Sequence, residues 1–249
     1  MSAPVFVHLG IGGARAGDVV TLDGPEARHA ATVQRRGVGE AIDLVDGRGM
    51  RASGVIVDVR PGALDVRVGA LGHDDDPVVV LVQALAKGGR DEQAVESATE
   101  LGVTKVIPWA AERSIVQWRG PKLDKGRSAW TALATAAAKQ SRRARIPEVG
   151  ALVSTAKLCA LVEGAIRGGA RVLVLHEAAA TGLARLEWDD VRQPVWLVVG
   201  PEGGISDAEL SALTDAGAQA VVLGPHVLRA STAGPAAVAV LAGLRGTWG

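Results

Sequence analysis

The sequence predicts an α/β protein in which a small β domain, residues 1–72, precedes an α/β domain with a parallel sheet, residues 77–249. Three observations lead to this prediction. Up to about residue 71, short segments of alternating polarity are separated by turn dipeptides. An acidic stretch at 73–77 then breaks the pattern. Beyond it, apolar strand-like runs alternate with helical patterns, which is typical of parallel strands joined by helical crossovers.

The first domain is expected to contain at least four short strands. Turn signals of the Asp-Gly and Pro-Gly type separate them, so neighbouring segments are expected to pair as strands of a small β-barrel or sandwich. The predicted strands are residues 19–22, 41–45, 54–59 and 64–68.

The second domain opens with the run VVVLVQAL, which is apolar enough for a strand buried on both faces. Helical periodicity and apolar runs then alternate to the end of the chain. Further strands are predicted at 105–108, 171–175, 195–199 and 220–223, and helices at 91–101, about 130–142, 155–166, after Ser206 and from about 233.

The composition limits the classes of partner. Lys+Arg and Asp+Glu both number 27, so an RNA site would have to be a local basic patch. The single cysteine excludes an intrachain disulfide and favours a reducing compartment, which predicts a cytoplasmic protein. No run reaches the ~18 apolar residues of a membrane span, and the scattered histidines lack metal-ligand spacing. Neither a membrane nor a metal partner is therefore expected.

Two glycine-rich loops follow predicted strands in the second domain. Strand VWLVV leads into Gly200–Gly204, and Ser206 with Glu209 forms a capping-box pattern that marks the next helix. Another strand ends in Leu223-Gly224-Pro225, and a third ends at Leu175. Ligands bind at the carboxyl edge of parallel sheets, where such loops leave backbone groups open, although a tight turn is the alternative reading of each loop.

These loops can bind an adenosine through backbone hydrogen bonds. A phosphate site is not indicated, because Gly10–Gly13 lacks the third glycine of a dinucleotide-binding motif and the P-loop pattern GxxxxGK[ST] is absent.

The stretch LVVGPEGGISDAEL, followed by LGPHVLRASTA, resembles the carboxy-terminal signature of RsmE-type ribosomal RNA methyltransferases of the SPOUT superfamily. Other stretches are similar to that family in the same order. They are Lys87-Gly88 with ESATELGV, Glu112-Arg113-Ser114, Lys139–Arg142 before Ile146-Pro147, and an RNA-binding entry motif from Arg28 to Arg35.

This resemblance implies a PUA-like β-barrel RNA-binding domain followed by a SPOUT methyltransferase domain with a trefoil knot. It also implies S-adenosyl-L-methionine (SAM) as cofactor and a homodimer formed through the knot region. The implied reaction is methylation of N3 of a specific uridine in 16S ribosomal RNA of the small ribosomal subunit.

The three loops supply the candidate cofactor-binding residues. These are Leu175, His176, Glu177, Val199, Gly200, Pro201, Glu202, Gly203, Gly204, Leu223, Gly224, Pro225, Val227 and Leu228.

Arg229 is the candidate catalytic residue. Removing the N3 proton leaves negative charge on the uracil ring, which a nearby guanidinium stabilises. The family commonly has Thr-Glu where Ala230-Ser231 stand, so an acidic catalytic residue at that place is in doubt here. An ion pair with a carboxylate such as Glu202 is the structural alternative for Arg229.

Three groups of cations are candidate RNA contacts, since phosphates attract Lys and Arg. The groups are Arg28, Arg35 and Arg36 in the first domain, Lys87, Arg90 and Arg113 along the cleft, and Arg142, Arg143 and Arg145 after a helix. A purely structural interpretation also applies to the last group, because cations are favoured at the end of a helix.

Three alternatives stay open. One is a SPOUT methyltransferase that acts on a ribose 2′-OH or a tRNA base, which the motif order and the first-domain motif disfavour. Another is a non-catalytic RNA-binding protein with a vestigial SAM site, which the intact glycine loops and Arg229 disfavour. The third, a generic nucleotide-binding domain, is weakened by the missing phosphate motifs.

Overall fold

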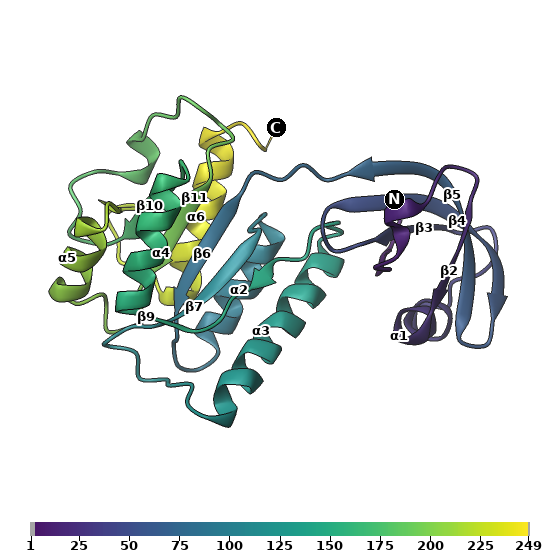
Figure 1. Cartoon of the computed structure of the whole chain (residues 1–249), viewed down its shortest axis with the longest axis horizontal. Coiled ribbons are helices and arrows are strands. Elements are labelled where there is room, and N and C mark those ends of the chain that lie inside the picture. Colours follow the sequence, from purple (N-terminus) through teal and green to yellow (C-terminus); the bar gives the residue numbers. More distant parts are fainter. Residues whose placement is uncertain (1–2, 249) are drawn as a thin grey trace. The chain divides into compact units, whose positions relative to one another are not determined.

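A computed structural model describes residues 3–248 of the chain. These residues form two compact units (Figure 1). The first unit consists of the chain up to Asp76 together with Ala136–Ile146, and the second consists of Pro77–Thr135 with the chain from Pro147 onward.

The first unit is built on a five-stranded sheet of order β1-β3-β4-β5-β2. β1 pairs with β3 in parallel, and the other neighbours are antiparallel. One face of these strands buries an apolar core that includes Phe6, Ile42 and Leu64. The strands are β1 (Val5–Val7), β2 (Val19–Asp23), β3 (Ala41–Val45), β4 (Met50–Arg60) and β5 (Ala63–His73).

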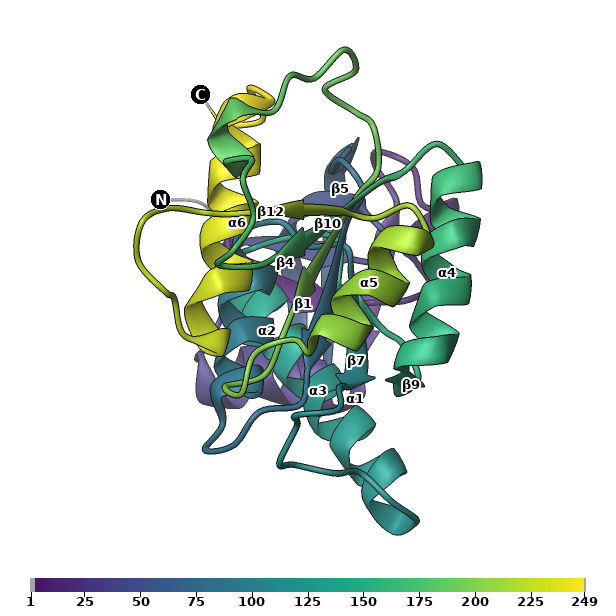
Figure 2. The same cartoon turned by 90° about the vertical axis from the view of Figure 1, so that its left-hand side faces the viewer.

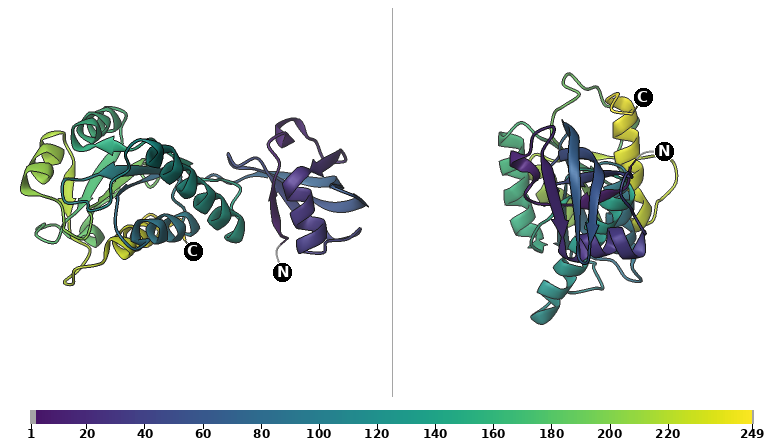
Figure 3. Two further views of the ribbon diagram at one scale, coloured as in Figure 1. Left: turned by 90° about the horizontal axis from the view of Figure 1, so that it is seen from below. Right: turned by 90° about the vertical axis from the view of Figure 1, so that its right-hand side faces the viewer.

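Short helical segments complete this unit. α1 (Gly24–Arg28) continues into a π-helical turn, His29–Val33 (Figure 3). Ala27 of α1 and Ala30 of the π-helical turn are part of the core. A 3₁₀ turn covers Ile11–Gly13. β4 and β5 are longer than predicted because they pair past an irregularity at Gly54, where an added Cβ would lie 2.4 Å from the Arg67 carbonyl oxygen.

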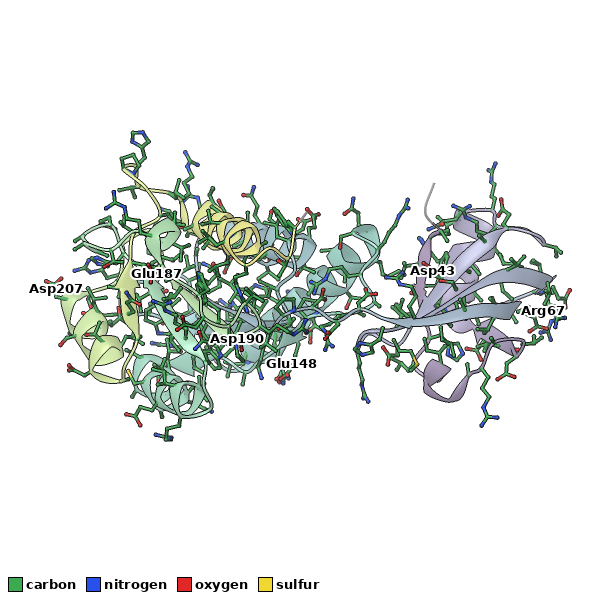
Figure 4. All side chains as sticks on the ribbon, turned by 90° about the horizontal axis from the view of Figure 1, so that it is seen from above. Asp43, Arg67, Glu148, Glu187, Asp190 and Asp207 are labelled. Carbon is green, nitrogen blue, oxygen red and sulfur yellow. The ribbon has the colours of Figure 1, made fainter. Side chains whose placement is uncertain are left out.

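Residues 136–146 are held in the first unit by polar contacts. The Lys139 ammonium binds the Glu26 carboxylate at 2.6 Å, and the Ala144 N–H donates to Asp74 at 2.7 Å. Arg51 joins Asp43 (Figure 4) and Asp74, and it also donates to the Arg142 carbonyl. Burial opposes the charge of Arg51, but these two carboxylates outweigh it and raise the pKa of the guanidinium.

The second unit contains a parallel sheet of order β12-β10-β11-β6-β7-β8, with β9 pairing β7. All pairings are parallel, which confirms the predicted α/β class. The strands are β6 (Val79–Ala84), β7 (Lys105–Ala110), β8 (Glu148–Val149), β9 (Val153–Ser154), β10 (Arg171–Leu175), β11 (Val195–Val199) and β12 (Gln219–Val221).

Helices cover both faces of this sheet (Figure 2). Alternate residues of β6 face opposite cores: Leu81 packs in a cluster with α2, α3 and α6, whereas Val80 packs in a cluster with α4 and α5. The helices are α2 (Arg90–Glu100), α3 (Pro121–Gln140), α4 (Thr155–Arg167), α5 (Asp207–Asp215) and α6 (Ala230–Leu244), with a 3₁₀ turn at Leu183–Arg185.

α3 and α6 begin earlier than predicted, at Pro121 and Ala230. Proline is well tolerated in a first helical turn, so Pro121 is compatible with this start. Within residues 3–248, no helix combines the length and apolarity needed to cross a bilayer.

Candidate functional site

Three neighbouring strand ends form the candidate site. β10, β11 and β12 are adjacent and parallel, so the loops that follow Leu175, Val199 and Val221 meet at one edge of the sheet. They line a cavity of about 580 Å³ and a smaller one of about 110 Å³, and both cavities share Leu175–Glu177, Val227 and Leu228. Each residue predicted from the sequence to bind the cofactor lines at least one of them.

The loop after β11 is tightly packed. A Cβ on Gly200 would lie 2.6 Å from Cγ1 of the buried Ile205, and one on Gly203 would lie 3.0 Å from the Arg113 Cβ. Gly204 has a φ of +74°, which favours glycine. The Arg113 guanidinium donates to the Gly203 carbonyl at 3.1 Å. Glycine is therefore required at several positions by close approach as well as by conformation.

Glu202 joins this loop to the start of α2. Its Oε1 accepts from the Lys87 N–H at 3.0 Å and from the Arg90 guanidinium at 2.9 Å. Partial burial acts to raise the pKa of the Glu202 carboxyl, but hydrogen bonds from its own backbone, Arg90 and Lys87 outweigh that effect and lower it. The ionised carboxylate thus links the loop after β11 to the segment that leads into α2.

Arg229 is exposed at the start of α6 and lines the larger cavity together with Arg90 and Arg113. Its carbonyl oxygen accepts from Thr232 and Ala233 as the helix N-cap, at 2.8 and 3.0 Å. Glu202 is paired with Arg90, so the alternative ion pair from Arg229 to Glu202 is not the one formed.

The residues that follow Arg229 are structural. Ala230 and Ser231 are buried in the first turn of α6, and neither side chain is an acid. Asp207, which the sequence reading did not select, also lines the cavity from the first turn of α5 (Figure 4). Its place after the capping residue Ser206 was the signal that could have found it. Among residues 3–248, no cluster of His, Cys, Asp or Glu has metal-binding geometry.

The candidate RNA-binding residues fall into different environments. Arg90 and Arg113 line the cavity, and Lys87 is exposed beside it. In the first unit Arg28, Arg35 and Arg142 are exposed, Arg36 is half-buried, and Arg145 is half-buried with its Nε lacking a partner. Arg143 is buried and pairs with Asp76 at 2.8 Å, so its guanidinium serves the packing of that unit.

Two of these arginines have an uncommon backbone conformation. Arg35 and Arg142, with φ of 54° and 59°, are the non-glycine residues with positive φ in the described part of the chain. Each ends a helical segment, where glycine is usual because a Cβ is disfavoured there. Their side chains are therefore retained at a cost of roughly 1–2 kcal/mol per residue.

Comparison with known proteins defines the class. The chain matches the model of the RNA methyltransferase domain over residues 74–242 and that of the RNA methyltransferase PUA domain over residues 22–69. It is similar to the structure of ribosomal RNA small subunit methyltransferase E from Neisseria gonorrhoeae bound to S-adenosyl methionine, with 26% identity, a TM-score of 0.85 and 98% of each chain covered. A Legionella pneumophila methyltransferase in complex with SAM gives 26%, 0.78 and 98% of each chain. The fold is thus that of an RNA methyltransferase with a PUA-like first domain.

Sequence relatives identify the family within that class. Ribosomal RNA small subunit methyltransferase E of Mycobacterium tuberculosis is 44% identical over 234 residues, which cover 93% of this chain and 89% of the relative. The Bacillus subtilis protein of that name is 28% identical over 221 residues, with coverage of 86% and 85%. The chain belongs to the ribosomal RNA small subunit methyltransferase E family, RsmE.

Proposed function

We propose that this chain transfers the methyl group of SAM to N3 of a uridine in 16S ribosomal RNA of the small ribosomal subunit. Membership of the RsmE family supports SAM-dependent methylation of small-subunit ribosomal RNA. Specificity for N3 of uridine is supported by the family signature around the two glycine loops. It is supported above all by Arg229, which is exposed, lines the cavity and is not paired with Glu202.

The residues present fit SAM. The larger cavity has a volume in the range of small-molecule sites. Val199, Leu175 and Leu228 offer apolar surface for an adenine, while the carboxylate of Glu177 and the loop backbone offer polar partners. A Cβ on Gly224 would meet nothing within 4 Å, so the backbone there is open to a ligand. SAM, when bound, supplies an electrophilic methyl group.

Arg229 acts on the acceptor base in this proposal. Its guanidinium favours the uracil anion because a nearby cation lowers the pKa of an acid, here the N3–H. Such fixed positive charge stabilises the charge that develops on the carbonyl oxygens during methyl transfer. Arg113 is a second cation at the same cavity, whereas the charge of Arg90 is paired with Glu202.

The first unit supplies RNA affinity in this proposal. Exposed arginines contact phosphates, which position the RNA and make binding depend on salt concentration. The proposed contacts are Arg28, Arg35, Arg36 and Arg142, with Lys87, Arg90 and Arg113 at the cavity. The trefoil knot, a homodimer through it, and a cytoplasmic location stay predictions.

Mass spectrometry of the RNA product tests the proposal. Purified protein is incubated with SAM and small-subunit RNA, free or assembled, from a strain that lacks this gene. The expected product is N3-methyluridine at one position. A 2′-O-methylated nucleotide would instead support the ribose alternative, and SAM binding without any product would support a non-catalytic RNA-binding protein.

A further inference from the structure

A buried carboxylate lies next to the cofactor loop without lining the cofactor cavity. Glu209 in α5 is 4% exposed. Its Oε1 accepts from the Glu112 N–H and from the Thr155 hydroxyl, both at 2.8 Å, and its Oε2 accepts from the Ser206 N–H at 3.2 Å. A capping box accounts only for the contact with Ser206. The other two contacts reach the loop after β7 and the start of α4.

These contacts complete a ring with the cofactor loop. Arg113 follows Glu112 directly and donates to the Gly203 carbonyl, while its Cβ limits the space at Gly203. Ser206 ends the same loop on the other side. One carboxylate therefore fixes both segments that meet at the contact between Arg113 and Gly203.

We propose that Glu209 is a positioning residue for the cofactor site. Its carboxylate holds the Gly200–Gly204 loop and Arg113 in a fixed position relative to each other. This inference rests on the proposed function, because it assigns the loop to SAM. Hydrogen bonds to an ionised acceptor are stronger than those between neutral groups. Losing the acceptor would leave the Glu112 N–H and the Thr155 hydroxyl, whose bonds to Glu209 are partly buried, without this partner, and an unpaired donor at such a place is unfavourable.

Glu209→Gln is the first test. It keeps the volume but places an amide N–H₂ against one set of donors, so the loop and Arg113 lose their common acceptor. We expect the Kd for SAM, measured by calorimetry, to rise about tenfold. The matched control is Ser154→Ala, which removes the N-cap of the adjacent α4, where Ser154 accepts from Lys157, and so lowers stability by about 1 kcal/mol. The control should leave the Kd for SAM unchanged.

A double-mutant cycle distinguishes positioning from simple loss of stability. If Glu209 acts through Arg113, the effects of Glu209→Gln and Arg113→Ala on the Kd for SAM will be clearly less than additive. Full additivity would overturn the inference. So would a Glu209→Gln variant that loses stability as Ser154→Ala does but keeps the wild-type Kd and KM for SAM.

A milder variant covers the case in which Glu209→Gln does not fold. Thr155→Val removes one donor to the carboxylate at nearly constant volume, and it also removes the acceptor of the Trp109 indole N–H. We expect a rise of about threefold in the Kd for SAM. An unchanged Kd would overturn the inference. Failure of the wild-type protein to bind SAM would instead overturn the proposed function, and this inference with it.

Discussion

The two glycine-containing loops of the cofactor cavity are held in different ways. The loop after β11 is fixed by side chains on both sides: Glu202 binds the start of α2, Gly203 accepts from Arg113, and the Ser206 N–H donates to the Glu209 carboxylate. The loop between β12 and α6 is exposed throughout residues 224–229, and Val227 is 78% exposed.

From this difference we expect one wall of the cavity to be formed in advance and the other to gain contacts on binding. A preorganised wall lowers the entropic cost of binding the cofactor. The exposure of Arg229 is compatible with the proposed contact between its guanidinium and the acceptor base. Five substitutions test this comparison.

Arg229→Ala, in the exposed loop, should have the largest effect. We expect methylation of ribosomal RNA to fall by about 10²–10³-fold, since one preorganised charge at a reacting group contributes on that scale. The Kd for SAM should change little, because the role assigned to Arg229 concerns the base. Arg167→Ala removes an exposed arginine paired with Glu163, outside both cavities, and serves as the control. Full activity of Arg229→Ala would remove Arg229 from the mechanism.

A matched pair of glycine substitutions compares the loops directly. Gly200→Ala forces a Cβ against Ile205, so we expect a loss of about 1–3 kcal/mol in stability together with weaker SAM binding. Gly224→Ala meets open space and should change stability by less than about 0.5 kcal/mol. Thermal unfolding and calorimetry measure both quantities. Equal destabilisation by the two variants would contradict the comparison.

Glu202→Gln removes a charge from the fixed loop. The folded-state pKa of Glu202 is lowered, so its carboxylate stabilises the protein above its unfolded-state pKa, and this contribution is lost as pH falls through the folded-state pKa. At about pH 7 the variant should be less stable by under about 1 kcal/mol, because the pair is partly solvated. Urea unfolding at neutral and acidic pH should show the difference vanish on acidification. A gap that persists in acid would show that ionisation is not its cause.

Val227→Ser should have the smallest effect on folding. Its side chain is largely exposed, so stability should stay within about 0.5 kcal/mol of the wild type. Because Val227 lines both cavities, we expect the Kd for SAM to rise a few-fold. A clear loss of stability would show that the exposed loop is packed before binding.

Strong local patterns made much of the fold predictable. β3, β10 and β11 begin and end at the predicted residues because dense apolar runs are bounded by polar or turn residues. β1, β8 and β9 contain two or three residues and exist only through pairing with distant strands, so no periodicity could mark them. The helical segment from Gly24 was hidden by the turn signal Asp23-Gly24-Pro25.

The parts of the candidate site that have local sequence signals were also predictable, whereas its long-range contacts were not. The glycine loops and the capping pair of Ser206 and Glu209 are local signals in the sequence. The contacts of Glu209 with Glu112 and Thr155 span 97 and 54 residues, and only the folded sheet brings these residues together.

Because residues 136–146 belong to the first unit, that unit cannot be isolated as one continuous fragment of the chain. A fragment that ends at Asp76 would lack the Lys139 partner of Glu26, the Ala144 N–H that binds Asp74, and the Arg143 partner of Asp76. It would also expose Val5 and Val45, which Ala144 covers. Limited proteolysis near residue 76 should therefore nick the chain without releasing a stable amino-terminal module. Grafting this PUA-like unit onto another enzyme would require both segments of the chain.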